Sequence, residues 1–301
     1  MKEEGTNLSI ESATPVYETE TPVLYAVAGG VARITLNRPQ YRNAQNGQMT
    51  YALDDAFKRA ADDDLVGAIV LEGAGNHFSA GHDIGSPGRD VDVGGRDRRS
   101  LWGDHVDRGG AERAYIREQE IYLEMCRRWR ALPKPTVAAV QGACIAGGLM
   151  LAWVCDLIIA SEDAFFSDPV LRMGVPGVEY FAHAFEMHPR IAREFLFLGA
   201  RMSAERAYQL GMVNRVVPRD DLARTAYEVA DRLEKLPRFG VALAKQALNL
   251  AEDFAGKRSA VDAAFGLHHL AHAHNQLLTG SGNAGLDAKT MAAKGRDDDR
   301  G

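Results

Sequence analysis

The chain has 301 residues, of which 46% are hydrophobic and 25% are charged, and its formal net charge is −6. This composition is typical of a globular protein with a sizeable core, and the acidic balance argues against nucleic acid as a partner. The three cysteines form no C-x-x-C pair, so we expect free thiols in a reducing compartment. The first residues do not resemble a signal peptide, and no apolar run is long enough to span a bilayer. We therefore expect a cytoplasmic protein.

Strands, turns and helices alternate over the first two-thirds of the chain. Residues 23–39 predict two short strands around a glycine pair, and residues 46–64 have the apolar spacing of a helix. Residues 66–75 predict a buried strand, and residues 112–132 predict a second long helix. This alternation is typical of an α/β fold with buried strands.

The pattern changes after residue 218, because only helical spacing follows. We expect a flexible arm at 1–20, an α/β core at 21–217, a helical region at 218–279 and a flexible tail at 280–301. The polar, glycine-rich segment at 87–110 is long enough for a lid or a mobile loop.

Two glycine-rich turns each follow a predicted strand, at residues 75–85 and 141–148. Such turns can present backbone N–H groups to a negatively charged atom. Acyl-transfer and enolate chemistry needs two such donors that converge on one oxygen. The second turn is followed by Leu149, Met150 and Leu151, so the predicted anion site has apolar neighbours.

Five ordered segments carry a resemblance to a known family: NRPQYRNAQN, FSAGHDIGS, VQGACIAGGLMLAWVCDLIIAS, MGVPGVEYF and GARMSAERAYQLGMVNRVV. Together they resemble the crotonase superfamily of enoyl-CoA hydratases and isomerases over residues 22–275. The resemblance implies a spiral core of ββα turns and C-terminal helices that pack on neighbouring subunits in trimers or hexamers. It also implies an acyl-CoA or enoyl-CoA thioester as the substrate and no tightly bound cofactor.

The resemblance also assigns site residues. The backbone N–H groups of His82 and Gly147 would form an oxyanion hole for the thioester carbonyl, while the His82 imidazole would face CoA or solvent. Met150 would indicate a bulky or apolar acyl group. The residues that match the family's CoA and substrate contacts are Arg42, Asn43, Ala44, Ala80, Gly81, His82, Asp83, Ile84, Ala143 and Met150.

The chain departs from the family at the two glutamates with which hydratases position water. One glutamate position is occupied by Met150, and the other falls on Pro169 or Val170, depending on the direction of counting. None of these residues is a carboxylate, and each general acid–base group contributes about 10²–10⁴-fold to the rate. We therefore expect inefficient hydration.

Two other acids are candidates for moving a proton. Asp168 adjoins the expected glutamate position, although it could instead cap the turn before Pro169. Glu179 follows the Pro-Gly turn, where apolar neighbours such as Phe181 would raise its pKa; the structural alternative is an acid at a helix start. His183 stands at i+4 on the same predicted helix, within reach of Glu179 or in a purely structural role.

These residues favour double-bond isomerisation over hydration. Hydration, the family default, stays open, as do hydrolysis of a thioester or C–C bond and a non-catalytic acyl-CoA-binding scaffold. His268 and His272 have the i, i+4 spacing of metal ligands but no acidic or cysteine neighbour in sequence, so we expect no metal. The G-x-S-x-G motif of serine hydrolases is absent, and the segment GAGNHFSAG is not a dinucleotide-binding fingerprint.

Overall fold

The computed structural model describes residues 21–86, 102, 105, 108–285 and 290. The predicted arm, most of the 87–110 segment and the chain beyond residue 285, apart from residue 290, lie outside these described residues. Within the described part, no helix combines the length and the apolar character needed to cross a lipid bilayer.

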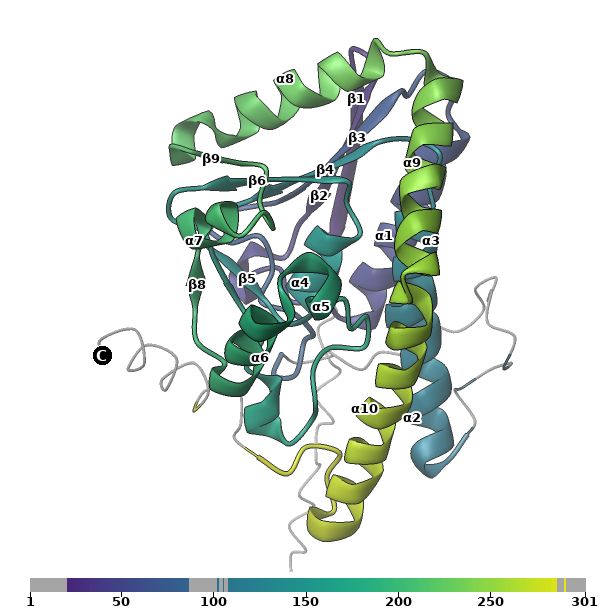
Figure 1. Cartoon of the computed structure of the whole chain (residues 1–301). Helices are drawn as coiled ribbons and strands as arrows, with labels where there is room; N and C mark the ends of the chain where they lie inside the picture. The colour runs from purple at the N-terminus through teal and green to yellow at the C-terminus, as the bar shows by residue number, and fades with distance from the viewer. Residues whose placement is uncertain (1–20, 87–101, 103–104, 106–107, 286–289, 291–301) are drawn as a thin grey trace, which may run out of the picture.

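Six strands form the main sheet in the order β1-β2-β3-β4-β6-β9 (Figure 1). Their bounds are β1 Val23–Ala28, β2 Val31–Leu36, β3 Ala68–Gly73, β4 Thr136–Val140, β6 Leu157–Ser161 and β9 Arg215–Val217. β1 and β2 form an antiparallel hairpin, as the glycine pair between them predicted, and the other neighbours pair in parallel. Parallel neighbours need long crossover connections, which explains the alternation of strands and helices in the sequence.

The central strands are buried on both faces. In β3, Ile69 and Leu71 join the main core, whereas Ala68 and Val70 join a second cluster with α8 (Leu222–Glu234). Figure 1 shows α8 lying across this face of the sheet. The unbroken apolar run of β3 is the sequence pattern that such a two-sided environment requires.

A second, three-stranded sheet consists of β5 (Ala143–Ile145), β7 (Phe165–Ser167) and β8 (Met202–Ser203). The short helix α4 (Gly147–Trp153) follows β5, and the 3₁₀ helix η3 (Val170–Met173) follows β7. Since β5 and β7 are parallel neighbours, the turn after one lies beside the segment after the other. This arrangement brings the turn that carries Gly147 next to the segment that carries Asp168.

The helical elements after the second sheet confirm the predicted change to a helical C-terminal region. α9 and α10 follow α8, and the structure as a whole is the α/β fold with C-terminal helices that the sequence indicated. The remaining helices are η1 Pro39–Tyr41, α1 Gly47–Asp62, α5 His183–Glu186, α6 Pro189–Leu198, α7 Ala204–Gln209, η4 Arg219–Asp221, α9 Arg238–Phe254 and α10 Lys257–Thr279.

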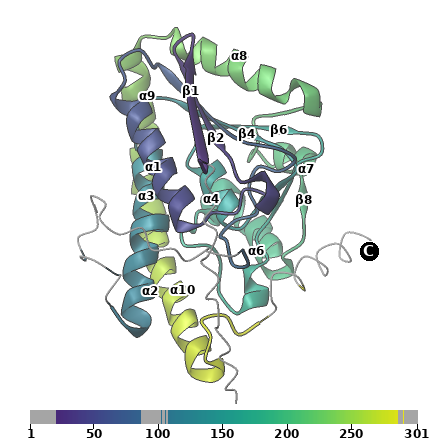
Figure 2. The same cartoon turned by 180° about the vertical axis from the view of Figure 1, so that it is seen from behind.

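The helix predicted over 112–132 contains a feature that periodicity did not predict. A π-helical segment, η2 (Gln119–Glu124), separates α2 (Gly110–Glu118) from α3 (Met125–Arg130). α2 lies beside α10 in both views (Figures 1 and 2). π-helical turns often occur at functional sites, and this one begins directly after Glu118.

Candidate active site

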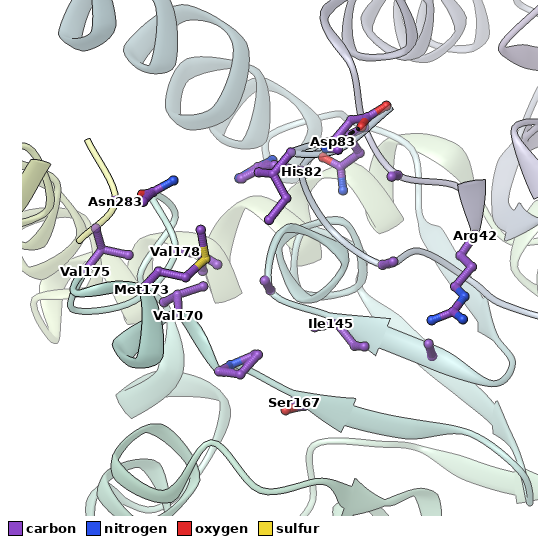
Figure 3. Close-up of a pocket in the computed structure, with 18 of the residues that line it drawn as sticks. Arg42, His82, Asp83, Ile145, Ser167, Val170, Met173, Val175, Val178 and Asn283 are labelled. Atoms are coloured by element: carbon purple, nitrogen blue, oxygen red, sulfur yellow. Dashed lines mark hydrogen bonds between the residues drawn. The ribbon is translucent and has the colours of Figure 1, made fainter. Parts of the chain in front are cut away.

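A cavity of about 830 Å³ lies between the loop after β3, the η3 segment, α2 and α10. One end is apolar, because Val170, Met173, Val175 and Val178 line it, and Arg42 lies at the other end (Figure 3). A volume of this size is typical of small-molecule sites.

The turn before α4 has a strained backbone. Ala146 adopts φ 49° and ψ −114°, a conformation that residues with a side chain rarely adopt. Among the described residues, neither the Gly147 amide nor the His82 amide has a hydrogen-bond acceptor. The two amides belong to adjoining segments, because a Cβ atom placed on Gly81 would lie 3.0 Å from the Gly147 nitrogen. The loop after β3 and the turn before α4 thus bring the His82 and Gly147 amides close together, and neither has an acceptor among the described residues.

A buried arginine fixes the loop that carries His82. Arg38 Nη1 lies 2.8 Å from Asp83 Oδ2 and also donates to the Ala44 carbonyl. Burial opposes ionisation of Asp83, but hydrogen bonds from Ser86 and Arg38 outweigh it and lower the pKa of the Asp83 carboxyl. The carboxylate of Asp83 is therefore engaged within the protein.

The predicted site residues divide into two groups. The cavity is lined by Arg42, Ala44, Ala80, His82, Asp83, Ile84, Ala143 and Glu179. The residues that do not line it are Asn43, Gly81, Gly147, Met150 and Asp168. Gly81 and Gly147 adjoin lining residues, and the Asn43 side chain accepts from the Arg38 amide and donates to two carbonyls.

The expectation that Met150 contacts an acyl group needs correction. Its side chain is 1% exposed and belongs to the main core, and it does not line the cavity. Pro169 and Val170, at the other hydratase glutamate position, do line the cavity. The cavity wall is therefore apolar where a hydratase would carry its second glutamate.

The role considered for Asp168 is corrected as well. Asp168 and His183 are both fully buried, and Asp168 Oδ2 lies 2.8 Å from His183 Nε2. The pair lies outside the lining of the cavity, so it stabilises the packing of η3 against α5. The predicted contact between His183 and Glu179 does not form, because α5 begins only at His183 and Glu179 precedes it in a loop.

Glu179 lines the cavity and contacts a different histidine. Glu179 Oε2 lies 2.8 Å from His82 Nε2, and the His82 ring stacks on Tyr122 with 3.7 Å between the ring centres. Burial opposes ionisation of Glu179, but the charges of His82 and His268 and the His82 hydrogen bond lower the pKa of this carboxyl below its usual range. Glu179 therefore stays ionised near neutral pH, and the expectation that its apolar neighbours raise its pKa is wrong.

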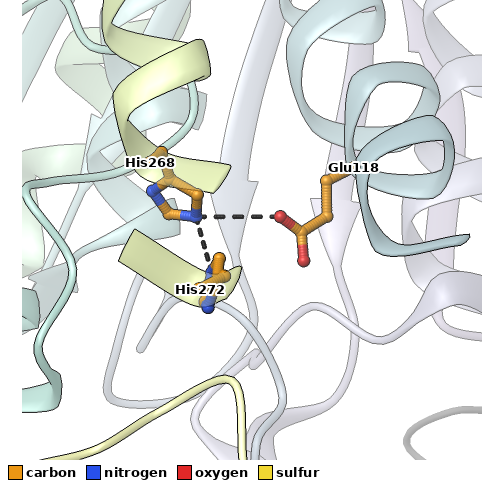
Figure 4. A group of neighbouring side chains, drawn as sticks. All are labelled: Glu118, His268 and His272. Atoms are coloured by element: carbon orange, nitrogen blue, oxygen red, sulfur yellow. Dashed lines mark hydrogen bonds and ion pairs between the residues drawn. The ribbon is translucent and has the colours of Figure 1, made fainter. Parts of the chain in front are cut away.

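A second carboxylate, which the sequence analysis missed, lies nearby. Glu118 lines the cavity, and its Oε2 lies 3.7 Å from His268 Nε2 and 3.3 Å from His269 Nε2 (Figure 4). Burial, followed by the charge of Glu179, raises the pKa of the Glu118 carboxyl to about 7. One sequence signal was available: Glu118 interrupts the apolar stripe of its helix between Tyr115 and Tyr122.

Glu118, His268 and His272 could hold a metal ion by distance alone, since their ligand atoms lie within 4.8 Å of one another. His268 Nδ1 and His272 Nδ1 each donate to a backbone carbonyl, and the two Nε2 atoms are 2.8 Å apart. Two nitrogens on a tetrahedral zinc ion, with bonds of about 2.0–2.1 Å, would lie roughly 3.4 Å apart. The shorter separation is that of a hydrogen bond between the two rings.

Comparison with known proteins gives close relatives. The sequence profile of the family described as enoyl-CoA hydratase/isomerase matches residues 26–99 and 103–289. "Putative enoyl-CoA hydratase EchA13" of Mycobacterium tuberculosis is 44% identical over 255 residues, which is 84% of this chain and 80% of that protein. The "1,2-epoxyphenylacetyl-CoA isomerase" of Escherichia coli is 33% identical over 235 residues, covering 76% of this chain and 82% of that protein.

A solved structure is equally similar. A probable enoyl-CoA hydratase from Mycobacterium thermoresistibile is 44% identical and superposes with a TM-score of 0.79, over 88% of this chain and 100% of its own. The agreement extends through the α/β core and the C-terminal helices, as the crotonase resemblance of the five sequence segments predicted. The chain belongs to the enoyl-CoA hydratase/isomerase family of the crotonase superfamily, and it is an enzyme of that family.

Proposed function

We propose that the protein isomerises the double bond of an enoyl-CoA thioester and that Glu179 moves the proton. The observation that carries this proposal is the Glu179–His82 contact of 2.8 Å at the cavity wall. A carboxylate held ionised beside a cavity can accept a proton from a carbon atom next to a thioester. The negative charge that then develops on the thioester oxygen must be stabilised by nearby hydrogen-bond donors.

The amides of His82 and Gly147 are the donors that we propose for this oxygen. Both lack an acceptor among the described residues, and the strained Ala146 backbone precedes one of them. Fixed N–H groups stabilise a developing oxyanion without reorganising, and loss of one such donor typically costs about 2.7–4 kcal/mol. In this arrangement His82 contributes through its amide and, separately, through its ring.

The lining of the cavity supports a CoA thioester as the substrate. The apolar end around Val170 and Met173 fits an acyl chain, and Arg42 at the opposite end fits the phosphates of CoA. Arg172 and Arg201 also line the cavity and add positive charge. We propose coenzyme A only as part of the substrate, with no tightly bound cofactor.

Hydration is the second candidate, and one observation favours it. Isomerisation fits the absence of carboxylates at residue 150 and at residues 169 and 170, the positions that match the glutamates of a hydratase of this family. However, Glu118 and Glu179 give the cavity two carboxylates from other elements, one of which has a pKa of about 7. Such a pair could position and activate water.

The test is mass spectrometry of the protein incubated in D₂O with 2-enoyl-CoA and 3-enoyl-CoA thioesters of several chain lengths. We expect interconversion of the two isomers with deuterium at carbon, and a loss of about 10²–10⁴-fold in Glu179→Gln. Mass gain by one water would favour hydration, and release of free CoA would favour hydrolysis. Binding by calorimetry without any reaction would favour a non-catalytic scaffold and overturn the proposal.

We also propose that the chain associates with copies of itself as a trimer or a dimer of trimers. Large apolar side chains are exposed along the last two helices of the described chain. They are Phe239, Leu243, Leu248, Leu250, Phe254, Leu267, Leu270, Leu277 and Leu278. An exposed apolar surface of this kind marks an interaction site in a folded protein, and light scattering after gel filtration gives the mass directly.

A further inference from the structure

Glu118 has no part in the isomerisation proposed above, yet it lines the same cavity as Glu179. The Glu118 side chain is 16% exposed; its Oε2 lies 3.3 Å from His269 Nε2 and 3.7 Å from His268 Nε2 but accepts no well-aligned hydrogen bond among the described residues. A buried carboxyl oxygen without such a bond is costly when it is ionised. Such a group is poised to carry a proton rather than a charge.

The two carboxylates share a neighbour. His268 Nε2 lies 3.7 Å from Glu118 Oε2 and 3.7 Å from Glu179 Oε1. His268 Nδ1 donates to the Gly177 carbonyl, so its Nε2 is the atom that faces the two acids, and this atom also lies 2.8 Å from His272 Nε2. The imidazole therefore lies between the two acids and lowers the pKa of both.

Several charged or titratable groups surround Glu118. From other elements these are Glu179, His82, His268, His269 and His272, and Arg117 precedes it on α2. Burial, and then the charge of Glu179, raises the pKa of Glu118, while His268, His82 and Arg117 lower it. The charges of His268 and His272, after burial, lower the pKa of His269 to about 4. Near neutral pH the site therefore contains an ionised Glu179 and a Glu118 that can hold a proton.

We propose that Glu118 is the second proton-carrying residue of this site and that it protonates the carbon at the far end of the shifting double bond. The proposal rests on the isomerase function proposed above. It differs from a one-base mechanism, in which Glu179 alone would carry the same proton from one carbon to the other.

The steps balance for a 3-enoyl thioester. The C2–H bond breaks, the proton goes to the Glu179 carboxylate, and the electron pair moves through the enolate onto the thioester oxygen. The electrons then return, the double bond forms between C2 and C3, and the Glu118 O–H bond breaks as its proton goes to C4. Glu179 is now protonated and Glu118 ionised. When the product has left, Glu179 loses its proton to water and Glu118 takes a proton from water, which restores the starting state.

The experiment follows an isotope from C2. We would give wild type and Glu118→Gln a 3-enoyl-CoA carrying deuterium at C2, in ordinary water, and locate the label in the 2-enoyl product. Wild type is expected to place solvent hydrogen at C4. Glu118→Gln is expected to lose about 10²–10⁴-fold in turnover, and its residual product should carry deuterium at C4.

The pH profile is a second readout, which a merely structural role would not move. Glu118 must be protonated to donate, so wild-type turnover should fall as the pH rises through about 7, where its carboxyl ionises. Glu118→Gln should lack this decrease in turnover above pH 7. Glu118→Asp should restore part of the turnover and also its decrease at high pH. Glu112→Gln, which removes an exposed carboxylate from the same helix, is the matched control and should behave as wild type.

The outcomes separate the two proposals. If Glu118→Gln retains wild-type turnover, pH profile and label position, Glu118 is no proton carrier and the Glu179 mechanism stands alone. If wild type moves deuterium from C2 to C4 itself, the one-base mechanism is correct and the proposal fails. If wild type binds every thioester but exchanges no hydrogen at C2, the proposed isomerase function is wrong, and so is the Glu118 proposal that rests on it.

Discussion

The carboxylate of Glu179 lies 2.8 Å from the imidazole of His82, although 97 positions separate the two residues in the chain. The contact joins the loop after β3 to the loop before α5, and it places a positive or proton-donating ring against a buried acid. Without that ring, burial would raise the pKa of Glu179. The charge state of the acid thus depends on its distant partner.

His82→Ala tests this dependence, because it keeps the backbone amide and removes the ring. An opposite charge at this distance lowers a carboxyl pKa by about 1–3 units, so the variant should require a higher pH for deuterium exchange. As the pH is lowered, the exchange rate of the variant should begin to fall about 1–3 pH units earlier than that of wild type, and it should recover as the pH rises. A uniform loss at every pH would instead indicate that the ring acts only in packing.

Gly147→Ala should disturb the same contact from the other side. A Cβ atom at residue 147 would lie 2.7 Å from Cε1 of the His82 ring, so the ring must move away from Glu179. We expect a loss of turnover of at least about 10²-fold, with a stability cost of about 1–3 kcal/mol. Kinetics and urea unfolding on the same preparation measure both quantities.

Gly266→Ala is the matched control for that substitution. Nothing lies within 4 Å of a Cβ atom at this exposed position inside α10. Replacing a glycine inside a helix by alanine should stabilise the fold by up to about 1 kcal/mol and leave turnover unchanged. Equal losses of turnover in both variants would show that the Gly147 effect is not local.

Asp168→Asn should affect stability rather than chemistry. Asp168 and His183 are both 0% exposed and lie 2.8 Å apart, and loss of a buried hydrogen bond that leaves a polar group unsatisfied typically costs about 1–3 kcal/mol. Turnover per folded molecule, obtained from activity and the unfolding curve together, should stay at the wild-type value. A stable Asp168→Asn protein that no longer exchanges deuterium would restore Asp168 as a candidate proton carrier.

Glu118→Gln should change how stability depends on pH. The Glu118 pKa is raised from 4.5 to about 7 on folding, so its contribution is fully present below pH 4.5 and is lost as the pH rises through 7. The variant lacks this loss, and its unfolding free energy relative to wild type should increase by up to ~3 kcal/mol between pH 4 and pH 8. Thermal unfolding at several pH values measures the trend, and parallel curves for the two proteins would contradict it.

The fold could be predicted from the sequence because the apolar pattern of its strands fits only a sheet that is buried on both faces. β3 is apolar at successive residues, which a strand exposed on one face would not be, and the structure buries it between the main core and α8. The hairpin of β1 and β2 follows equally from its glycine pair. Both signals are local in the sequence.

The site was only partly predictable, because its contacts join distant segments. The prediction that Glu179 lies at the site agrees with its place in the cavity lining, but its partner comes from another loop and not from i+4. Asp168 adjoins the right segment, yet β7 leads its side chain into the core. Glu118 and His268 meet only because α2 and α10 pack together, and no spacing rule connects residues so far apart.

The helix α10 has one face on the cavity and another on the protein surface. His268 faces the cavity from this helix, whereas its neighbours Leu267 and Leu270 are exposed on the protein surface. Any partner copy that covers those leucines also fixes the position of the helix and hence of the imidazole. Assembly and turnover are then thermodynamically linked, so dilution below the dissociation constant should lower the activity of each remaining chain, and addition of catalytically inactive Glu179→Gln copies should restore it.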